Sequence, residues 1–328
     1  MTTFLATLTP MLTLFVCIAV GFILSKCKIL PNGSGKVMAK METWIFCPAL
    51  SFMTMARFCT VESVGEHLIN IILSAIGVAF AIAISLILSP LFVKEKGTER
   101  GVYYYALAFA NSGYMGDPIV LAIFGEAALS YYKLFSLPIQ LMIYSWGIGV
   151  MTPGTGKKSD FFRRMLNAPT IAMLVGIAVG LSGLGNYLPE FLVGSLDALK
   201  SCMGPVAMLL AGVTIAKYDF ESMLKNKKVY IATFLRLTVL PALIIALLYG
   251  LKTLANTLFD LTIGNDVLFL TFFATATPLG LNTVVFPEAY GGNPETGASM
   301  AMISHTLCVI SIPLLYALMV ALFGAPFQ

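Results

Sequence analysis

A polar stretch inside a long apolar segment, ANSGYMGDPIV at 110–120, holds the residues best suited to chemistry. Asn111 offers an amide and Asp117 a carboxylate, while Pro118 interrupts the helix that the surrounding residues favour. Non-helical backbone deep in a membrane is tolerated only where protein or a water-filled cavity satisfies its polar groups. The stretch therefore predicts a broken helix whose free N–H groups and dipole bind a small anionic solute.

A second segment has the same character. FATATPLG at 273–280 aligns with FANSGYMG at 109–116, with three identities in eight positions. We expect non-helical backbone at Gly113–Asp117 and at Thr277–Gly280, and we expect the two segments to cross near the bilayer midplane. Frequent proline and glycine in continuous membrane helices is the alternative interpretation. The residues predicted to break the helices are Gly113, Gly116, Pro118, Pro278 and Gly280.

Asp117 has two interpretations. Directly before a proline, it is suited to cap a half-helix, whose dipole favours its charge by about 0.3–1 kcal/mol. An ionised carboxylate at the bilayer centre costs about 2.5–3.5 kcal/mol, which favours instead a group that titrates or holds a cation. In that case Asp117 couples proton or sodium movement to the solute. The sequence leaves both interpretations open.

Membrane helices must position these residues. The chain of 328 residues is 58% hydrophobic and 11% charged, whereas soluble domains are about 25% charged. The sequence therefore predicts an all-α integral membrane protein surrounded by a lipid bilayer, with spans of about 20 residues. Ten spans are predicted, at 4–24, 34–55, 67–92, 101–125, 129–152, 168–184, 189–215, 229–250, 267–290 and 296–322.

Lysine and arginine gather in alternate loops. The loops after even-numbered spans hold few of them, namely Arg57, Lys133 and Lys252. Basic loops stay in the cytoplasm, so both termini are predicted to lie outside it. The basic residues after odd-numbered spans are Lys26, Lys28, Lys36, Lys40, Lys94, Lys96, Arg100, Lys157, Lys158, Arg163, Arg164, Lys217, Lys225, Lys227 and Lys228.

The basic loop around Lys157 divides the spans into two sets of five. Because five is odd, the second set enters the membrane from the opposite side, as in transporters built from inverted repeats. We expect an N-terminal repeat at 1–153, a cytoplasmic linker at 154–166 and a C-terminal inverted repeat at 167–328.

Several motifs together resemble the auxin efflux carrier family, which holds plant auxin carriers and bacterial malate or malonate permease-like proteins. The plant proteins carry Asn-x-x-x-Met-Gly-x-Pro where this chain has 111–118, and Pro-x-Leu-Ser-Phe where it has 48–52. Their Pro-x-Gly and Val-Phe-x-x-x-Tyr motifs correspond to 278–280 and 285–290. The resemblance covers essentially the whole chain.

The resemblance implies ten helices in two inverted repeats, with helices four and nine broken and crossing, similar to bile-acid symporters and sodium/proton antiporters. Spans one, two, six and seven would form a scaffold, often a homodimer, and the other spans a moving core. A bacterial-type carrier is expected in the plasma (inner) membrane. The acidic–basic pair that plant carriers hold in span three is missing at 67–92. The expected substrate is therefore a small organic anion other than auxin.

Five polar residues are predicted to bind the solute. The Asn111 amide would meet a carboxylate, or else satisfy carbonyls freed by the helix break. Ser51 and Gln140 resemble pocket positions of the plant carriers, although such groups also form hydrogen bonds between helices. Thr277 and Asn282 flank the second break.

Two more ionisable residues lie within predicted spans. His305 is either a proton relay or, more commonly for such a residue, a buried and hydrogen-bonded histidine. Arg236 lies about two turns from Lys228, so its long side chain is expected to reach the cytoplasmic surface.

The leading functional hypothesis is a secondary carrier that moves a carboxylate by alternating access. The alternative is a membrane sensor or receptor that uses the same fold without transport. The HExxH, GxSxG and Walker signatures are absent from the sequence, so neither enzyme activity nor ATP hydrolysis is predicted. The six cysteines lack metal-binding spacing and the basic residues are scattered, so no metal, cofactor or nucleic-acid partner is predicted.

Overall fold

Helices form nearly all of the computed structural model, which describes residues 2–152, 166–218, 221, 225–260 and 263–327. Within these ranges the only strand-like pairing is one antiparallel β-bridge between Ala110 and Leu279. The predicted all-α class is confirmed. The predicted linker at 154–166 lies almost wholly outside the described residues.

Long apolar helices support a multi-pass membrane protein. Four stretches of helix are long and apolar enough to cross a bilayer, and a fifth candidate pairs Ala127–Phe135 with Leu137–Met151 at an angle of 46°. In the part of the chain that the structure describes, the remaining predicted spans do not meet this criterion, so the count of ten stays a prediction. The four stretches are α5 (Leu68–Phe92), α12 (Glu190–Ile215), the helix Lys227–Phe259 and α18 (Glu295–Phe323).

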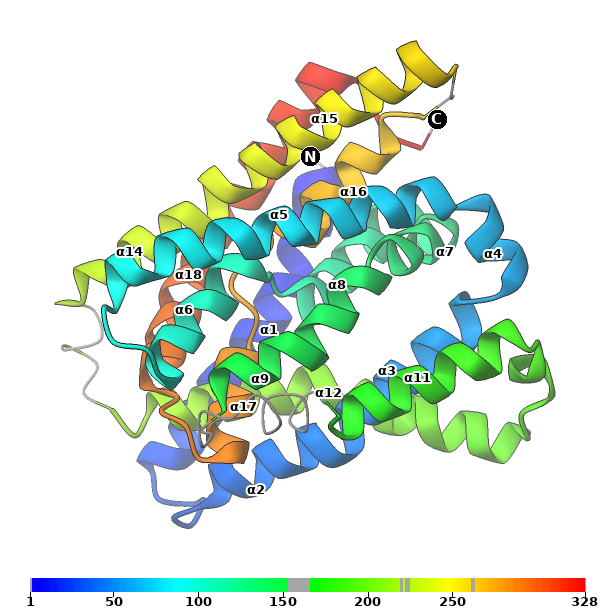
Figure 1. Ribbon diagram of the computed structural model, residues 1–328. Coiled ribbons are helices and arrows are strands. Elements are labelled where there is room, and N and C mark those ends of the chain that lie inside the picture. The colour runs from blue at the N-terminus through cyan, green and yellow to red at the C-terminus, as the bar shows by residue number, and fades with distance from the viewer. Residues whose placement is uncertain (1, 153–165, 219–220, 222–224, 261–262, 328) are drawn as a thin grey trace.

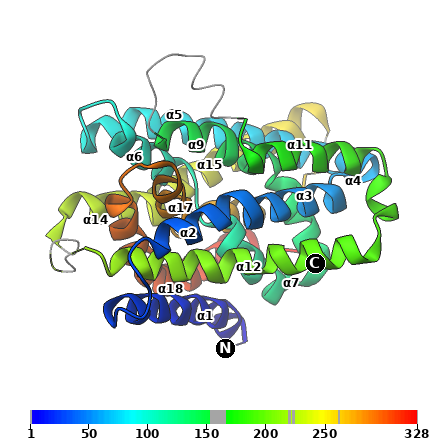
Figure 2. The same ribbon diagram turned by 90° about the horizontal axis from the view of Figure 1, so that it is seen from below.

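One group of helices comprises α1 (Thr2–Lys26), α3 (Cys47–Phe58), α11 (Ala168–Leu181) and α12. Here α1 packs along α12, and α3 packs along both α11 and α12, as the rows of helices in Figure 2 show. A Cβ atom at Gly212 would lie 2.0 Å from the Ile18 carbonyl oxygen, so glycine is needed where α12 meets α1. The resemblance assigns these same helices to the scaffold.

The second group lies on the other side of the molecule, with α5 and α15 along the top of Figure 1. In it α5 packs against α6 and α15, while α14 packs against α18. Its further members are α6 (Thr98–Ala108), α7 (Asp117–Phe135), α8 (Leu137–Met142), α9 (Ile148–Met151), α14 (Lys227–Phe234), α15 (Leu240–Phe259), α16 (Asp266–Thr275) and α17 (Asn282–Tyr290). The short helices α4 (Val61–Glu66) and η4 (Leu184–Tyr187) complete the described elements, apart from helix α2 and the π-helical turns.

Four π-helical turns widen the described helices. They are η1 (Glu42–Phe46), which joins α2 (Ser34–Met41) to α3, η2 (Ser112–Gly116), η3 (Ile143–Gly147) and η5 (Leu235–Val239). Pro48, Pro118 and Pro241 each stand two residues after such a turn. Because proline lacks an N–H and crowds the carbonyl four residues earlier, the preceding turn widens. Such turns often occur at functional sites.

The first helix break lies earlier than predicted. Phe109 is extended and Ala110 forms the β-bridge, whereas Gly113 and Gly116 belong to the π turn η2. Asp117 has helical φ and ψ angles of −55° and −54°, so the expectation that Pro118 would force it out of the helical region is wrong. The break follows the tertiary pairing, which satisfies the backbone at Ala110, rather than the proline.

The second break runs from 276 to 281, between α16 and α17, and includes the predicted segment Thr277–Gly280. Pro278 and Gly280 both lie in this non-helical backbone. The two breaks therefore differ in how they follow the sequence: the second is located by its proline and glycine, and the first is not.

Candidate functional site

The two broken helices cross in direct contact. The Asn111 N–H donates to the Pro278 carbonyl oxygen at 2.7 Å, next to the bridge between Ala110 and Leu279. The Tyr132 hydroxyl, on α7, lies 3.3 Å from the Ser112 carbonyl oxygen and 3.2 Å from that of Phe273. One tyrosine therefore links η2 to α16, the helix that precedes the second break.

Arg236 binds the carbonyl ends of both broken helices. Its side chain is 1% exposed and comes from the π turn η5. One guanidinium nitrogen donates to the Leu107 carbonyl oxygen at 3.3 Å, near the end of α6, and another donates to the Thr275 carbonyl oxygen, at the end of α16. A cation at a helix C-terminus satisfies free carbonyls and stabilises the negative end of the dipole. The expectation that Arg236 reaches the cytoplasmic surface is wrong.

A small cavity of about 30 Å³ lies at the opposite, N–H ends of the broken helices. The N–H groups of Ser112, Gly113 and Tyr114 at the start of η2 have no backbone carbonyl partner in the described chain, so they are available to a ligand. In α17 the N–H groups of Thr283 and Val284 already bind the Gly280 and Leu281 carbonyl oxygens, at 3.1 and 2.8 Å. A cavity of this volume holds one or two water molecules. Its lining comprises Leu50, Ala110, Asn111, Ser112, Gly113, Tyr114, Gln140, Ile143, Tyr144, Met203, Gly280 and Asn282.

Three of the five predicted solute ligands line this cavity: Asn111, Gln140 and Asn282. Ser51 and Thr277 are buried, at 0% and 1% exposure, but they are not among the described residues that line it. Within the described chain, no hydrogen-bond partner meets the side-chain oxygens of the three lining amides. The cavity therefore presents acceptors from side chains and donors from the backbone.

The contacts of His305 fix the orientation of the Asn111 amide. His305 Nδ1 lies 2.7 Å from the Ala301 carbonyl oxygen, which can only accept, so Nδ1 carries the proton. Nε2 is then an acceptor, and the Asn111 NH₂ group donates to it at 3.1 Å. His305 is 1% exposed. The structure thus agrees with a buried, hydrogen-bonded histidine. Because the Asn111 NH₂ group faces His305, the Asn111 side-chain oxygen points away from the imidazole ring.

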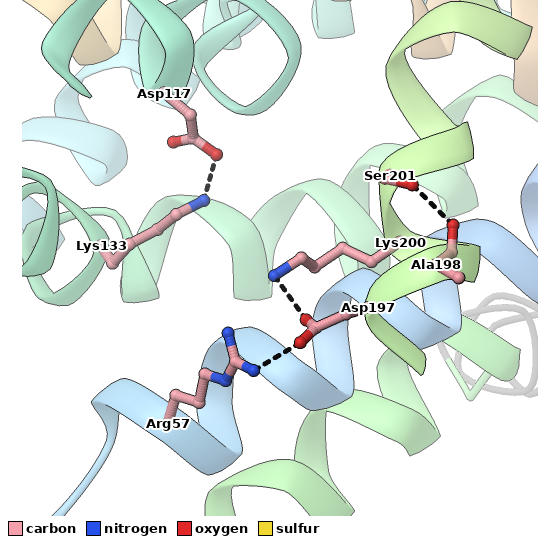
Figure 3. A network of polar contacts seen from close by, with 7 residues as sticks. All are labelled: Arg57, Asp117, Lys133, Asp197, Ala198, Lys200 and Ser201. Atoms are coloured by element: carbon pink, nitrogen blue, oxygen red, sulfur yellow. Dashed lines mark hydrogen bonds and ion pairs between the residues drawn. The ribbon is translucent and has the colours of Figure 1, made fainter. Parts of the chain in front are cut away.

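Asp117 pairs with Lys133 inside helix α7. Gly125, with φ 81° and ψ −174°, kinks this helix and brings the two ends of its sequence together. The Lys133 ammonium donates to the Asp117 carboxylate, as Figure 3 shows, and the two side chains are 7% and 17% exposed. Asp117 has helical backbone angles where η2 passes into α7, so it is not an N-cap residue.

A second charged group lies on the first helix group. Arg57 of α3 contacts Asp197 of α12 at 2.5 Å, and Lys200 contacts the same carboxylate at 3.0 Å. Figure 3 shows this group beside the Asp117–Lys133 pair. The cations predicted for even-numbered loops therefore lie within helices: Arg57 in the last turn of α3, Lys133 in α7 and Lys252 in α15.

Sequence reasoning missed the roles of three residues that contact the broken helices. Arg236 and Lys133 are the clearest cases, because a charged residue within an apolar span is itself a signal of function. Tyr105 is the third: its hydroxyl accepts a hydrogen bond from the Asn282 amide at 2.8 Å. Nothing in the local pattern of α6 distinguishes Tyr105 from its neighbours Tyr103 and Tyr104.

Crossed broken helices within a helical membrane protein define a class to which many transporters belong. Comparison with known proteins agrees. The model of the membrane transport protein family matches residues 6–161 and 157–316. The chain belongs to this family, the auxin efflux carrier family that its motifs indicated.

Two archaeal relatives match about two thirds of the chain. An uncharacterized transporter of Methanocaldococcus jannaschii is 22% identical over 209 residues, covering 62% of this chain and 68% of the relative. An uncharacterized transporter of Methanothermobacter thermautotrophicus is 23% identical over 216 residues, covering 65% and 69%. These matches are to a transporter family rather than an enzyme family.

Proposed function

We propose that the protein is a secondary transporter that carries a small organic anion by alternating access, with the substrate bound at the crossover cavity. The supporting observation is the cavity at the N–H ends of both broken helices, lined by Asn111, Gln140 and Asn282. Helix N-termini attract anions, and here the carbonyl ends are already occupied by Arg236.

The donor and acceptor pattern narrows the proposed substrate. Backbone N–H groups suit a carboxylate, whereas the amide oxygens of Asn111, Gln140 and Asn282 need a donor. A carboxylate that also carries a hydroxyl group meets both requirements. Malate and succinate, which differ by one hydroxyl, therefore form a matched pair of probes.

The proposed transport cycle moves the second helix group against the first. The helices α1, α2–α3, α11 and α12 act as scaffold and as the surface of a homodimer, while the crossover moves with the other helices. Ten spans in two inverted repeats, 1–153 and 167–328, with both termini outside the cytoplasm and the plasma membrane as location, complete the proposal. The possible coupling ion is a proton or sodium.

The first test is ligand-dependent thermal unfolding of purified protein with malate and succinate. We expect malate to raise the melting temperature more than succinate, because only malate carries the hydroxyl group. A ligand at 100 times its dissociation constant stabilises the folded protein by about 2.7 kcal/mol. Asn111→Ala should weaken malate binding about two- to tenfold, because it removes a neutral hydrogen bond from the malate hydroxyl to the Asn111 oxygen, worth about 0.5–1.5 kcal/mol. The matched control is Asn186→Ala, an exposed asparagine in η4.

Counterflow of labelled malate in proteoliposomes then separates transport from sensing. A carrier exchanges internal malate for external label, and at low malate concentration Asn111→Ala slows this exchange while Asn186→Ala does not. Binding of malate without counterflow would favour the sensor hypothesis. No stabilisation by either acid would contradict the proposed substrate class.

A further inference from the structure

A buried glutamate lies on the scaffold side of the crossover. Glu42 is 0% exposed and sits in the π turn η1, between α2 and α3. Its Oε1 has no hydrogen-bond partner in the described chain, and its Oε2 contacts only the Cys47 thiol, at 3.8 Å. A carboxylate with one weak donor and no cation is too costly to bury, so the group is held as the neutral acid.

The elements packed against η1 supply no free positive charge. Helix α3 brings Cys47, and α17 brings Tyr290 and Glu288, whose carboxylate pairs with Lys217 at 2.6 Å. The Lys217–Glu288 pair lies beside Gly35. Gly35 is about 10 Å along the helix from Glu42, at 1.5 Å per residue, so this pair does not neutralise Glu42.

The other neighbouring elements are equally neutral near Glu42. Helix α11 contains no acidic, basic or histidine residue, and Lys36 and Lys40 of α2 are exposed to the surroundings. On α12, Asp197 and Lys200 are engaged with Arg57 at the far end of α3. Glu42 is therefore neutralised by a proton and not by an ion pair.

A short chain of polar atoms connects Glu42 to the cavity. Cys47 Sγ lies 3.8 Å from Glu42 Oε2 and 4.0 Å from the Tyr114 hydroxyl. Tyr114 belongs to η2 and lines the crossover cavity. The Cys47 thiol is therefore the one group between the Glu42 carboxyl and Tyr114, which lines the proposed substrate site.

Glu42 also lies where the two helix groups meet. The turn η1 packs against α11 and α12 of the first group and against α17 of the second, and α2 runs beside α17 in Figures 1 and 2. Movement of α17 and η2 away from η1 would admit water to a carboxyl group that is sealed in this closed state.

We propose that Glu42 is the proton-binding site that couples proton movement to anion transport, a role resting on the proposed carrier function. In the closed state the proton stays on the Glu42 carboxyl. When the groups separate, the O–H bond breaks, the proton passes to water and the carboxylate is exposed. The emptied, water-filled site then reopens to the opposite face with Glu42 still ionised, and water on that face returns the proton, so one proton crosses the membrane in each cycle.

Infrared difference spectroscopy of the purified protein tests proton binding without any substrate. The spectrum between acidic and alkaline pH should contain the C=O band of a buried carboxylic acid in the wild type. The band should vanish in Glu42→Gln and persist in Glu66→Gln, a control at a side chain that is 66% exposed. An unchanged band in Glu42→Gln would overturn the proposal.

Labelled malate in proteoliposomes tests coupling. An inward proton gradient should accelerate wild-type uptake several-fold, and Glu42→Gln should lose this response while retaining counterflow within about threefold. Glu42→Asp should recover part of the gradient response, which a merely structural glutamate would not require. A full gradient response in Glu42→Gln would overturn the proposal.

The two experiments distinguish failure of the inference from failure of the proposed function. Absence of malate transport in every variant, together with loss of the infrared band in Glu42→Gln, contradicts malate carriage but supports the proton site. Normal malate counterflow with no Glu42 band contradicts the proton site alone.

Discussion

The two ends of the crossed helices differ in what balances their partial charges. At the carbonyl ends of α6 and α16, a permanent cation, Arg236, is buried and donates to both helices. At the N–H ends of η2 and α17, the protein leaves a cavity lined in part by the amides of Asn111, Gln140 and Asn282. A helix pair that carries its own counter-charge at one end only is suited to accept a negative ligand at the other.

The buried acids near the N–H ends show why this difference matters. A free carboxylate there would compete with an anionic ligand for the same dipoles. Asp117 is neutralised by Lys133, and Glu42 by the proton inferred above, so neither presents a net negative charge to the cavity. A buried carboxyl group is thus neutralised by an ion pair in the second helix group and by a proton in the first.

Removing the cation at the carbonyl ends should have the largest effect. Arg236→Met deletes two hydrogen bonds to a charged group, each worth about 1.5–3 kcal/mol, and leaves carbonyls of both helices unsatisfied. We expect little monodisperse protein by size-exclusion chromatography and a strongly lowered melting temperature. Arg236→Lys should be intermediate, because a single ammonium lacks the planar fork that reaches two carbonyls.

Arg57→Met is the matched control for this comparison. Its ion pair with Asp197 is 44% and 33% exposed, and such pairs contribute about 0–1 kcal/mol. Equal stability of the Arg236→Met and Arg57→Met proteins would show that the carbonyl ends need no cation.

The Asp117–Lys133 pair should have the next largest effect, measured by a double-mutant cycle. Lys133→Met strands a buried carboxylate and should destabilise by about 3–5 kcal/mol. The double variant Asp117→Asn with Lys133→Met should recover much of that loss, and it should restore the malate binding that the single change weakens. Chemical denaturation and thermal shift measure the two quantities.

The same cycle decides the remaining role of Asp117. If Lys133 only neutralises it, Asp117→Asn keeps the response of malate uptake to a proton or sodium gradient. Loss of that response, with counterflow intact, would assign coupling to Asp117. Strictly additive stabilities of the two single variants would mean that the pair does not interact in the membrane.

The sequence predicted the crossover better than the positions of its charges. Pro278 and Gly280 locate the second break, whose Leu279 also pairs with Ala110. The first break depends on the pairing of Ala110 with Leu279, a contact between residues far apart in the chain, which no local pattern contains. Proline at 118 predicted a break because local preference disfavours helix there, yet a widened turn satisfied the same constraint.

The positions of charged side chains were not predicted from the sequence for a related reason. The sequence places Lys133 among the basic residues of even-numbered loops, whereas the structure places it inside α7, where the kink at Gly125 brings Asp117 to it. Arg236 was expected at the surface because its length permits this, and its true partners are backbone carbonyls of two other helices. The polar amides were easier to place, since Asn111 and Asn282 lie directly beside the breaks.

The smallest expected effect lies within the N–H end itself and separates packing from binding. A Cβ atom at Gly116 would lie 2.3 Å from the Tyr132 hydroxyl and 3.2 Å from the Phe273 carbonyl oxygen, whereas one at Gly113 meets no atom within 4 Å. Gly116→Ala should therefore destabilise by about 1–3 kcal/mol, as overpacked sites do.

Gly113→Ala adds its methyl group in open space, at a residue that lines the cavity. Its unfolding should match the wild type within about 0.5 kcal/mol, the range of changes that disturb no packing. Its affinity for malate should nevertheless fall a few-fold, because a methyl group beside the free N–H groups of η2 restricts how closely a carboxylate approaches them. Thermal unfolding with and without malate measures both quantities on one sample. If Gly113→Ala bound malate as the wild type does while Gly116→Ala lost stability as expected, the N–H end of η2 would be a packing element and the ligand would lie elsewhere.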